Sequence, residues 1–449
     1  MLDKQRAYFK SGKTLDIKFR INSLKILKES ILNNLDELVK AFKEDYNKCE
    51  FDVYSTEVGL VIKEINYFIK HLKRLAKAKK VRTSLINIPS CGYRVSEPYG
   101  NVLVVAPWNY PFQLAMMPLI GALAAGNTVY LKNSRNTPKV SEVIKNILSV
   151  FEEEYVYVME NTKENMDKLF DLKFDYIFYT GSPSVAKDLM SRQAKHLTPM
   201  TLELGGKSPC IIDKDANIEK SAKRLVWGKY LNAGQTCVAP DYVLVHNDVK
   251  RDLIKYILKY INEFYYENGK LREDYTGIVN ERSIKKLLSL TYKGKIICGG
   301  NSTGETLEPT VLDDVSFNDE IMKEEIFGPI MPLIEFNNID DVINHLKDLD
   351  KPLALYYFGK RNKNKVIKHL SFGGGCINDT IMHLTEEKLP FGGVGLSGFG
   401  SYHGKRSFEL FSHEKSILKK HSKFEVNLKY PPYNKNKLKL TKFYFKIKK

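Results

Sequence analysis

Two short segments of this 449-residue chain contain side chains that could carry out acyl chemistry. Cys237 ends the run Asn-Ala-Gly-Gln-Thr-Cys (232–237), and Glu203 lies 34 residues upstream, before Leu204-Gly205-Gly206. Small and glycine residues leave a thiol open to a carbonyl compound and give a nearby carboxylate room to move. A thiol nucleophile and a carboxylate base are the pair that acyl transfer through a thioester needs. The alternative for Cys237 alone is a small buried hydrophobic residue, as most free cysteines are.

Further motifs favour the catalytic interpretation of Cys237 and Glu203. Both segments closely resemble the active-site cysteine and glutamate motifs of the aldehyde dehydrogenase superfamily, and the similarity runs in order from about Ser96 to Lys420. The other matching segments are 104–111, 128–132, 178–186, 323–329, 373–378 and 389–395. The contexts 198–203, 208–210 and 401–404 are most similar to the class 3 branch, which acts on fatty and aromatic aldehydes.

The resemblance implies an enzyme that oxidises an aldehyde to the carboxylic acid with NAD or NADP. Cys237 would form a thiohemiacetal and then a thioester, with hydride transfer to the nicotinamide. The side-chain amide of Asn109 and the backbone N–H of Cys237 would stabilise the oxyanion, typically by about 3 to 4 kcal/mol per donor. Glu203 would activate the water that releases the acid, and Glu325 is the alternative base. The expected substrate is a medium- or long-chain aliphatic aldehyde or an aromatic one.

The cofactor contacts also follow from the resemblance, because the usual GxGxxG dinucleotide fingerprint is missing. Residues 178–186 match the coenzyme turn of the family, in which a strand ends near Gly181 and a helix begins at Ser182-Pro183. The N-terminus of such a helix suits a phosphate. The expected contacts are Ala106, Pro107, Trp108, Lys132, Gly181, Ser182, Val185, Leu204, Gly205, Glu325 and Phe327, and no metal is expected.

Arg135 departs from the family pattern. The family commonly follows its strand lysine with Pro-Ser/Ala-Glu, whereas Lys132 is followed here by Asn133-Ser134-Arg135. The family glutamate accepts hydrogen bonds from ribose hydroxyls, but a guanidinium suits a 2′-phosphate. The sequence therefore predicts use of NADP, with a solvent-facing Arg135 as the alternative.

Alternating strand and helix patterns must position these segments. Apolar runs at 102–106, 128–132 and 175–180 predict buried strands, with helices at 114–125 and from Ser182-Pro183 onward. This alternation predicts a doubly wound parallel sheet. Beyond Glu203, apolar runs at 210–212, 242–245, 331–334 and 353–356 predict a second α/β domain.

The expected fold class is α/β and aldehyde dehydrogenase-like, with three parts. These are a doubly wound parallel-sheet cofactor domain (1–82 and 98–204), an α/β catalytic domain (205–395) and a small β oligomerisation element (83–97 and 396–449). Apolar periodicity predicts helices at 21–41 and 55–79, and residues 83–96 predict a hairpin that turns at Pro89–Gly92. Charged and apolar residues alternate at 435–445, which favours an edge strand or a surface arm.

Charge and composition bear on partners and location. The net charge of +17 is concentrated in residues 415–449, where twelve lysines face one acid, Glu425, so the other 414 residues carry only +6. A solvated chain end is favoured over contact with an anionic membrane, and no nucleic-acid partner is expected. Six cysteines without metal-type spacing, and a charged N-terminus without a signal peptide, predict a cytoplasmic protein. By resemblance, a homodimer is expected.

Two rival functions remain. A coenzyme A-acylating enzyme on the same fold would have no use for a base that activates water, so Glu203 argues against it. A basic scaffold without catalysis would not need Cys237, Glu203 and Asn109 together.

Overall fold

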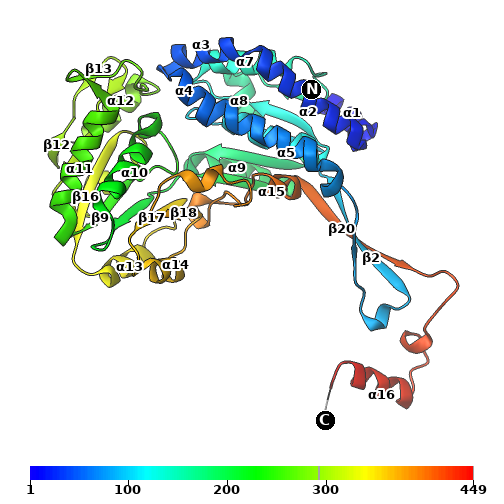
Figure 1. The fold of residues 1–449 in the computed structure, drawn as a ribbon. Helices are drawn as coiled ribbons and strands as arrows, with labels where there is room; N and C mark the ends of the chain where they lie inside the picture. Colours follow the sequence, from blue (N-terminus) through cyan, green and yellow to red (C-terminus); the bar gives the residue numbers. More distant parts are fainter. Residues whose placement is uncertain (292–293, 448–449) are drawn as a thin grey trace. The chain divides into compact units, whose positions relative to one another are not determined.

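The computed structural model describes residues 1–291 and 294–447 of the chain. Contacts within the chain divide these residues into two compact units. The larger unit comprises Met1–Leu75 and Pro98–His413, and the smaller one comprises Ala76–Glu97 and Glu414–Lys449. Two β-sheets with helices against them form the larger unit (Figure 1), which confirms the α/β fold class.

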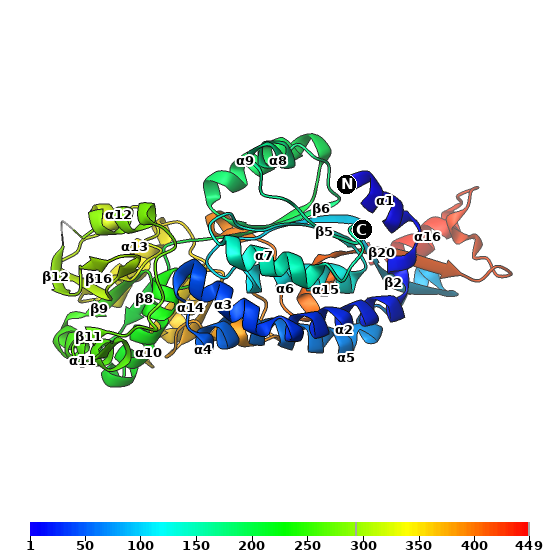
Figure 2. The same cartoon turned by 90° about the horizontal axis from the view of Figure 1, so that it is seen from above.

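The first sheet has six strands in the order β19-β7-β6-β3-β4-β5. Their bounds are β3 Asn101–Val105, β4 Thr128–Lys132, β5 Val156–Val158, β6 Tyr176–Gly181, β7 Met200–Leu204 and β19 Gly398–Phe399. All pairs are parallel except that of β19 with β7. The connecting helices are α6 Gln113–Ala125, α7 Pro138–Leu148, α8 Lys163–Leu169 and α9 Pro183–Gln193. Helices α8 and α9 lie on one face of the sheet, and α6 and α7 lie on the other (Figure 2).

Helices near the N-terminus form a further layer over α6 and α7 (Figure 2). They are α2 Ile17–Asn33, α3 Leu35–Tyr46, α4 Glu50–Asp52, the π-helix η2 Val53–Val58 and α5 Gly59–Leu75, whereas α1 Leu2–Lys10 contacts β3 and β4. The single helix expected at 21–41 was wrong, because Asn34 leaves the helical conformation and separates α2 from α3. Every residue of α6 is buried, since it lies between the sheet and this helical layer.

The second sheet has seven strands in the order β12-β15-β16-β9-β8-β17-β18. Their bounds are β8 Pro209–Ile212, β9 Tyr242–His246, β12 Lys295–Cys298, β15 Thr310–Asp313, β16 Ile330–Phe336, β17 Ala354–Phe358 and β18 Gly374–Ile377. The main helices are α10 Ile218–Tyr230, α11 Asn247–Tyr265, α12 Glu281–Ser289, α13 Ile339–Asp348 and α14 Lys363–His369. Successive residues of a strand point to opposite faces of this sheet, and each face has its own apolar core. Ile211, for example, belongs to one core and its neighbour Cys210 to the other.

The smaller unit is built on a three-stranded sheet in the order β1-β2-β20. Its strands are β1 Lys79–Val81, β2 Ser90–Pro98 and β20 Ser412–Lys420. An antiparallel hairpin is present, but the predicted turn was wrong: Val81 pairs with Gly92, so Gly92 lies inside a strand and residues 82–89 form the connection.

Of the two forms expected for the tail, an edge strand or a surface arm, the edge strand was wrong, because α16 Lys435–Tyr444 is a helix. The side chain of Asn434 accepts a hydrogen bond of 2.9 Å from the backbone N–H of Lys437 and so caps this helix. Lysine and leucine are good helix formers, and this local preference decides the conformation over the two-residue alternation. Leu438, Leu440 and Phe443 on this helix are exposed.

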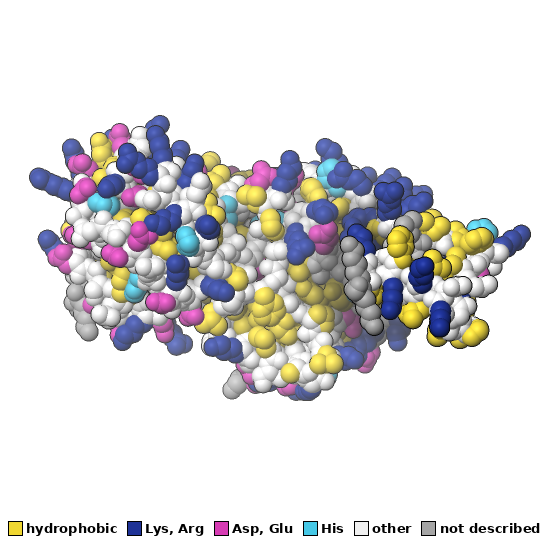
Figure 3. Space-filling view, turned by 90° about the horizontal axis from the view of Figure 1, so that it is seen from below, with side chains coloured by type: hydrophobic (Ala, Val, Ile, Leu, Met, Phe, Trp, Pro, Cys, Tyr) yellow, Lys and Arg dark blue, Asp and Glu magenta, His cyan; other side chains and the backbone are white. Residues whose placement is uncertain are grey.

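Basic side chains are interspersed with acidic ones over the surface in the view of Figure 3, rather than collected in one groove. None of the described helices combines the length and apolar character needed to cross a membrane.

Candidate active site

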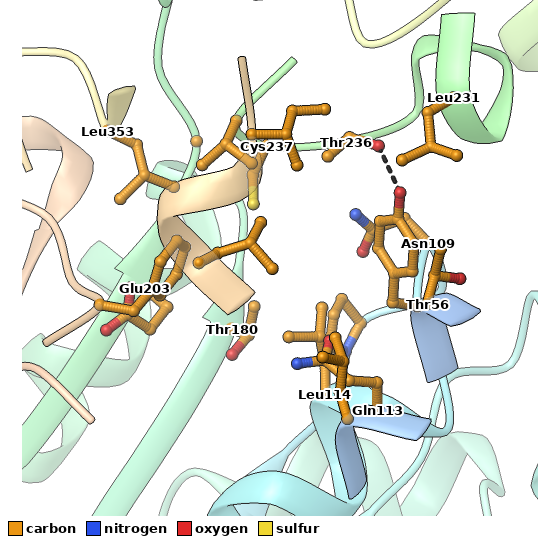
Figure 4. A pocket seen from close by; sticks show the side chains of 18 of the residues that line it. Thr56, Asn109, Gln113, Leu114, Thr180, Glu203, Leu231, Thr236, Cys237 and Leu353 are labelled. Carbon is orange, nitrogen blue, oxygen red and sulfur yellow. Dashed lines mark hydrogen bonds between the residues drawn. The ribbon is translucent and has the colours of Figure 1, made fainter. Parts of the chain in front are cut away.

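A cavity of about 450 Å³ in the larger unit is lined by residues from both sheets. The end of β7 contributes Glu203, and the loop after β3 contributes Asn109. The loop before β9 contributes Cys237, and the loop before β16 contributes Glu325. The structure therefore brings the four residues predicted to be catalytic into one cavity. In Figure 4, Cys237 lies above the cavity, with Glu203 at one side and Asn109 at the other.

The loop before Cys237 has a strained and closely held backbone. Asn232, Ala233 and Gly234 all have φ between 51° and 72°, a conformation that residues other than glycine seldom adopt. A Cβ at Gly234 would collide with the carbonyl oxygen of Gly328, so only glycine fits there. Gln235 donates to the carbonyl of Gly277 at 2.9 Å. Strain of this kind is commonly found at functional sites.

The Cys237 thiol is neutral in this environment. Burial raises its pKa far above the usual range, and the nearby Glu325 and Glu203 carboxyl groups raise it further. A thiolate is the reactive form of cysteine, so the thiol must lose its proton to a base when a substrate binds.

Asn109 is tied directly to the cysteine loop. Its side-chain amide donates a 3.1 Å hydrogen bond to the carbonyl of Gln235, and its own carbonyl accepts one of 3.0 Å from Asn232. The next residue, Tyr110, makes a 2.7 Å hydrogen bond between its hydroxyl and that of Thr236, drawn as the dashed line in Figure 4. Asn109 lines the cavity and is only 4% exposed, so its amide is largely shielded from bulk water.

Glu203 is a buried carboxyl group without a partner. It is 3% exposed, and neither carboxyl oxygen has a hydrogen-bond partner among the described residues. Burial raises its pKa well above the usual value. An isolated carboxylate is unfavourable in such surroundings, so burial favours the protonated form of this group.

Glu325 is held by a network that sequence motifs alone did not reveal. The ammonium of Lys207 contacts Asp241 at 2.5 Å, and the other oxygen of Asp241 accepts from the backbone N–H of Ile326 at 3.0 Å. Burial raises the pKa of Glu325 to about 8, and Asp241 adds to this, whereas the N–H of Gly206 opposes it. A Cβ at Gly205 would collide with the Glu325 carboxylate, which explains the glycine there.

Several of the predicted cofactor residues line the same cavity. They are Pro107, Trp108, Gly181, Leu204, Gly205, Glu325 and Phe327. The rings of Trp108 and Phe327 meet edge to face, with 5.3 Å between their centroids. Ala106, Lys132, Arg135, Ser182 and Val185 lie outside the cavity lining. The structure thus gathers seven of the predicted contacts around the thiol.

The remaining residues are suited to the phosphate and ribose parts of a dinucleotide. Ser182 begins α9 without a side-chain capping bond, and its helix N-terminus is exposed. The side chains of Lys132 and Arg135, at and just after the end of β4, make no hydrogen bond or ion pair within residues 1–291 and 294–447, and burial together with Arg135 lowers the pKa of Lys132 to about 8. Unpaired cations and an open helix N-terminus each suit a phosphate group, so these residues fit NAD or NADP.

Tyr110, Thr236, Lys207 and Asp241 are the site residues that sequence reasoning missed. Tyr110, Thr236 and Lys207 stand inside recognised motifs, but their roles depend on partners far away in the chain. Asp241 lies just beyond the cysteine motif, and its one signal is a charge directly before an apolar strand.

Comparison with known proteins agrees with this geometry. The model described as "Aldehyde dehydrogenase family" matches residues 1–417. The chain is 46% identical to 4,4'-diaponeurosporen-aldehyde dehydrogenase of Staphylococcus aureus over 98% of this chain and 97% of that protein. It is 40% identical to the mouse protein named "Aldehyde dehydrogenase, dimeric NADP-preferring", over 96% and 97% of the two chains.

Among solved structures, "Substrate bound state of Staphylococcus Aureus AldH" superposes with a TM-score of 0.96 and 45% identity, and the match covers 99% of this chain and 98% of the other. The chain therefore belongs to the aldehyde dehydrogenase family, and its reaction is the NAD(P)-dependent oxidation of an aldehyde to a carboxylic acid.

Proposed function

We propose that Cys237 is the nucleophile of this oxidation, on the observation that one cavity holds its thiol together with Asn109, Glu203 and Glu325. The sulfur attacks the aldehyde carbon and forms a thiohemiacetal. Because burial and two carboxyl groups raise the pKa of the thiol, its proton leaves as the sulfur attacks rather than beforehand, and the ionised form of one of these carboxyl groups, Glu203 or Glu325, accepts it.

Asn109 and the backbone N–H of Cys237 stabilise the oxyanion that this attack creates. The amide of Asn109 donates one N–H to the carbonyl of Gln235, two residues before the thiol, so its second N–H is left for a substrate oxygen. A preorganised donor in a water-poor site stabilises developing negative charge more strongly than water does. The nicotinamide ring, when bound, supplies the hydride acceptor, and Cys237 then carries a thioester.

Glu203 is the base that activates water against the thioester, with Glu325 as the alternative. Glu203 has no hydrogen-bond partner to give up among the described residues, so its carboxyl group is free to reach a water molecule once it has lost its proton. Glu325 is held more firmly, since the loop around it is anchored by Lys207 and Asp241. The freedom of Glu203 favours it over Glu325.

The substrate is a medium- or long-chain aliphatic aldehyde or an aromatic one. The cavity wall includes Leu60, Leu114, Trp227, Leu231 and Met382, which offer apolar surface to a hydrocarbon chain or ring. The name of the Staphylococcus aureus relative specifies a 4,4'-diaponeurosporen-aldehyde, which supports a hydrophobic aldehyde here.

Lys132 and Arg135 bind the adenosine 2′-phosphate, so the protein uses NADP at least as well as NAD. Both cations lack an ion-pair partner in the described part of the chain, and the mouse relative is named NADP-preferring.

The protein acts as a homodimer through its smaller unit. Strand β20 is at the edge of the three-stranded sheet, and Ile417 and Leu418 on it are about half exposed, so it can pair with another copy. The same mouse relative is named dimeric.

The central test compares wild type with Cys237→Ala, using aldehydes of increasing chain length with NAD⁺ and with NADP⁺. We expect the substitution to reduce turnover by more than about a thousandfold, because a covalent nucleophile is lost. Cofactor affinity should change little. Cys298→Ala removes a thiol outside the cavity and is the matched control. Turnover by Cys237→Ala above one part in a thousand would overturn the assignment.

A further inference from the structure

A fully buried ion pair lies behind the wall of the cavity. The ammonium of Lys48 is 2.8 Å from a carboxyl oxygen of Glu57, and both side chains are 0% exposed. Removing two charges from water costs several kcal/mol per ion, and a buried pair is often no more stabilising than apolar residues of the same size. Stability alone therefore does not account for this pair.

Glu57 belongs to the π-helix η2, an uncommon element. π-Helical turns are rare and occur frequently at functional sites. The wide turn brings the carbonyl of Tyr54 so close to Gly59 that a Cβ at Gly59 would lie 2.7 Å from this oxygen. Asp52, Ser55 and Thr56, in and beside this turn, line the cavity. The side chain of Glu57 thus anchors a segment whose neighbours face the substrate.

The other contacts of the pair hold the loop that carries Asn109. The second carboxyl oxygen of Glu57 accepts a 2.8 Å hydrogen bond from the backbone N–H of Gln113, the first residue of α6. A negative charge at a helix N-terminus is favourable. The ammonium of Lys48 lies 4.3 Å from the centroid of the Tyr110 ring, within the range of a cation–π interaction. Both ends of the loop from Asn109 to Gln113 are therefore fixed by the two charges.

Tyr110 transmits this constraint to the nucleophile. Its hydroxyl bonds that of Thr236 at 2.7 Å, directly before Cys237, while the neighbouring Asn109 bonds Gln235. Figure 4 shows Thr56, Asn109 and Gln113 on the same side of the cavity, across from Glu203. Lys48, the Tyr110 ring and Thr236 thus form a continuous path from the buried charge pair to the thiol.

We propose that Lys48 and Glu57 are positioning residues for the oxidation step, which hold Asn109 and the Cys237 loop in reacting geometry through Tyr110 and the start of α6. They touch neither substrate nor cofactor. The pair also links the cavity wall at Thr56 to the loop bearing Asn109. The same ion pair therefore influences both the fit of the aldehyde and the position of the oxyanion donor. This inference rests on the proposed roles of Cys237 and Asn109.

The test measures NAD(P)H formation in a single turnover at saturating aldehyde, in Lys48→Met, Glu57→Gln and the double variant. We expect each single variant to slow this step at least tenfold, with the Kd for NAD(P)⁺ within about twofold of wild type. The double variant should recover thermal stability, since no unpaired charge remains buried, and should stay slow. Lys48→Arg should restore part of the rate, because it keeps the cation over Tyr110.

Lys250→Met is the matched control, because Lys250 and Asp313 form another largely buried ion pair, 2.6 Å apart, and neither lines the cavity. It should lower stability and leave the rate within threefold of wild type. A folded Lys48→Met or Glu57→Gln variant with a rate within threefold of wild type would overturn the proposal. Recovery of rate together with stability in the double variant would do the same.

Running Cys237→Ala in parallel separates this inference from the function that underlies it. If Cys237→Ala forms no NAD(P)H while the charge variants keep normal rates, the positioning role of Lys48 and Glu57 is rejected and the role of Cys237 as nucleophile is retained. Product formation by Cys237→Ala removes the proposed nucleophile and the inference together.

Discussion

The side-chain amide of Asn109 donates to the backbone carbonyl of Gln235 at 3.1 Å, and this bond joins a loop of the first sheet to a loop of the second. Asn109 follows β3, whereas Gln235 precedes β9, so the two residues are 126 positions apart. The bond holds the proposed oxyanion donor two residues from Cys237 before any substrate arrives. An amide already held in place needs little reorganisation when charge develops on the substrate.

Asn109→Ala should lower kcat by about a hundredfold or more, as expected when one oxyanion donor is removed. KM should change much less, because the ground-state carbonyl carries little charge. Steady-state kinetics with one aldehyde check this, and Asn301→Ala, on the exposed surface, is the control. A tenfold rise in KM with unchanged kcat would contradict a role confined to the transition state.

The two buried carboxyl groups can be told apart by kinetics. Glu203→Gln should leave hydride transfer fast and slow the release of the acid, so a burst of NAD(P)H precedes a slow steady rate. Glu325→Gln should not produce this burst if Glu203 activates the water. Stopped-flow absorbance on both variants decides between them, and the opposite pattern would assign the base to Glu325.

The strands around the site could be predicted from the sequence because their signals are local. Apolar runs predicted β3, β4, β6, β8 and β9 nearly residue for residue. Cys237, Glu203 and Asn109 were predicted from short motifs that resemble those of the aldehyde dehydrogenase family, and their catalytic roles stay predictions. The parallel first sheet places the carboxyl ends of β3 and β7, and with them Asn109 and Glu203, at the same edge, whereas Cys237 comes from the loop before β9 of the second sheet.

Features that depend on distant partners could not be predicted. The Lys207–Asp241 pair needs two loops to meet, and a charge in a motif does not reveal its partner. The π-turn at Glu57 has no periodic signature, because one wide turn inside a helical pattern leaves the apolar spacing almost unchanged. In α16, two-residue alternation was misleading because no strand of the described chain pairs with this segment, whereas a helix satisfies its backbone internally.

Glu64 should make the protein less stable as the pH rises. It is buried and accepts hydrogen bonds from the N–H of Gly404 and the hydroxyl of Ser407, yet burial raises its pKa to about 7. Between the unfolded pKa near 4.5 and the folded pKa near 7, the folded state binds more protons than the unfolded state. The free energy of unfolding therefore falls over this interval and levels off above it.

Glu64→Gln tests this linkage because glutamine does not titrate. The free energy of unfolding of the variant minus that of wild type should rise by about 2 to 3 kcal/mol from pH 5 to pH 8.5. Denaturant unfolding at the two pH values gives the difference. A constant difference between variant and wild type across this range would contradict the raised pKa.

Arg135 provides the test of cofactor choice. The adenosine 2′-phosphate carries nearly two negative charges, and the guanidinium of Arg135 offers it a fork of donors. Contacts of this kind are worth about 1 to 2 kcal/mol when partly exposed, which is roughly five- to thirtyfold in affinity. Lys132, three residues earlier, supplies a second cation whose pKa of about 8 leaves it largely charged at neutral pH.

Arg135→Glu should therefore lower kcat/KM for NADP⁺ by at least tenfold and leave that for NAD⁺ within about threefold. The new carboxylate would repel the 2′-phosphate but could accept from the ribose hydroxyls of NAD⁺. Arg251→Glu, at an exposed arginine on α11, makes the same change of charge at a position outside the proposed cofactor contacts and is the control. If wild type prefers NAD⁺ by more than tenfold and Arg135→Glu does not alter the ratio, Arg135 has no part in the choice of cofactor. A similar loss in both charge variants would instead trace the effect to the overall field of a basic protein rather than to a contact with the phosphate.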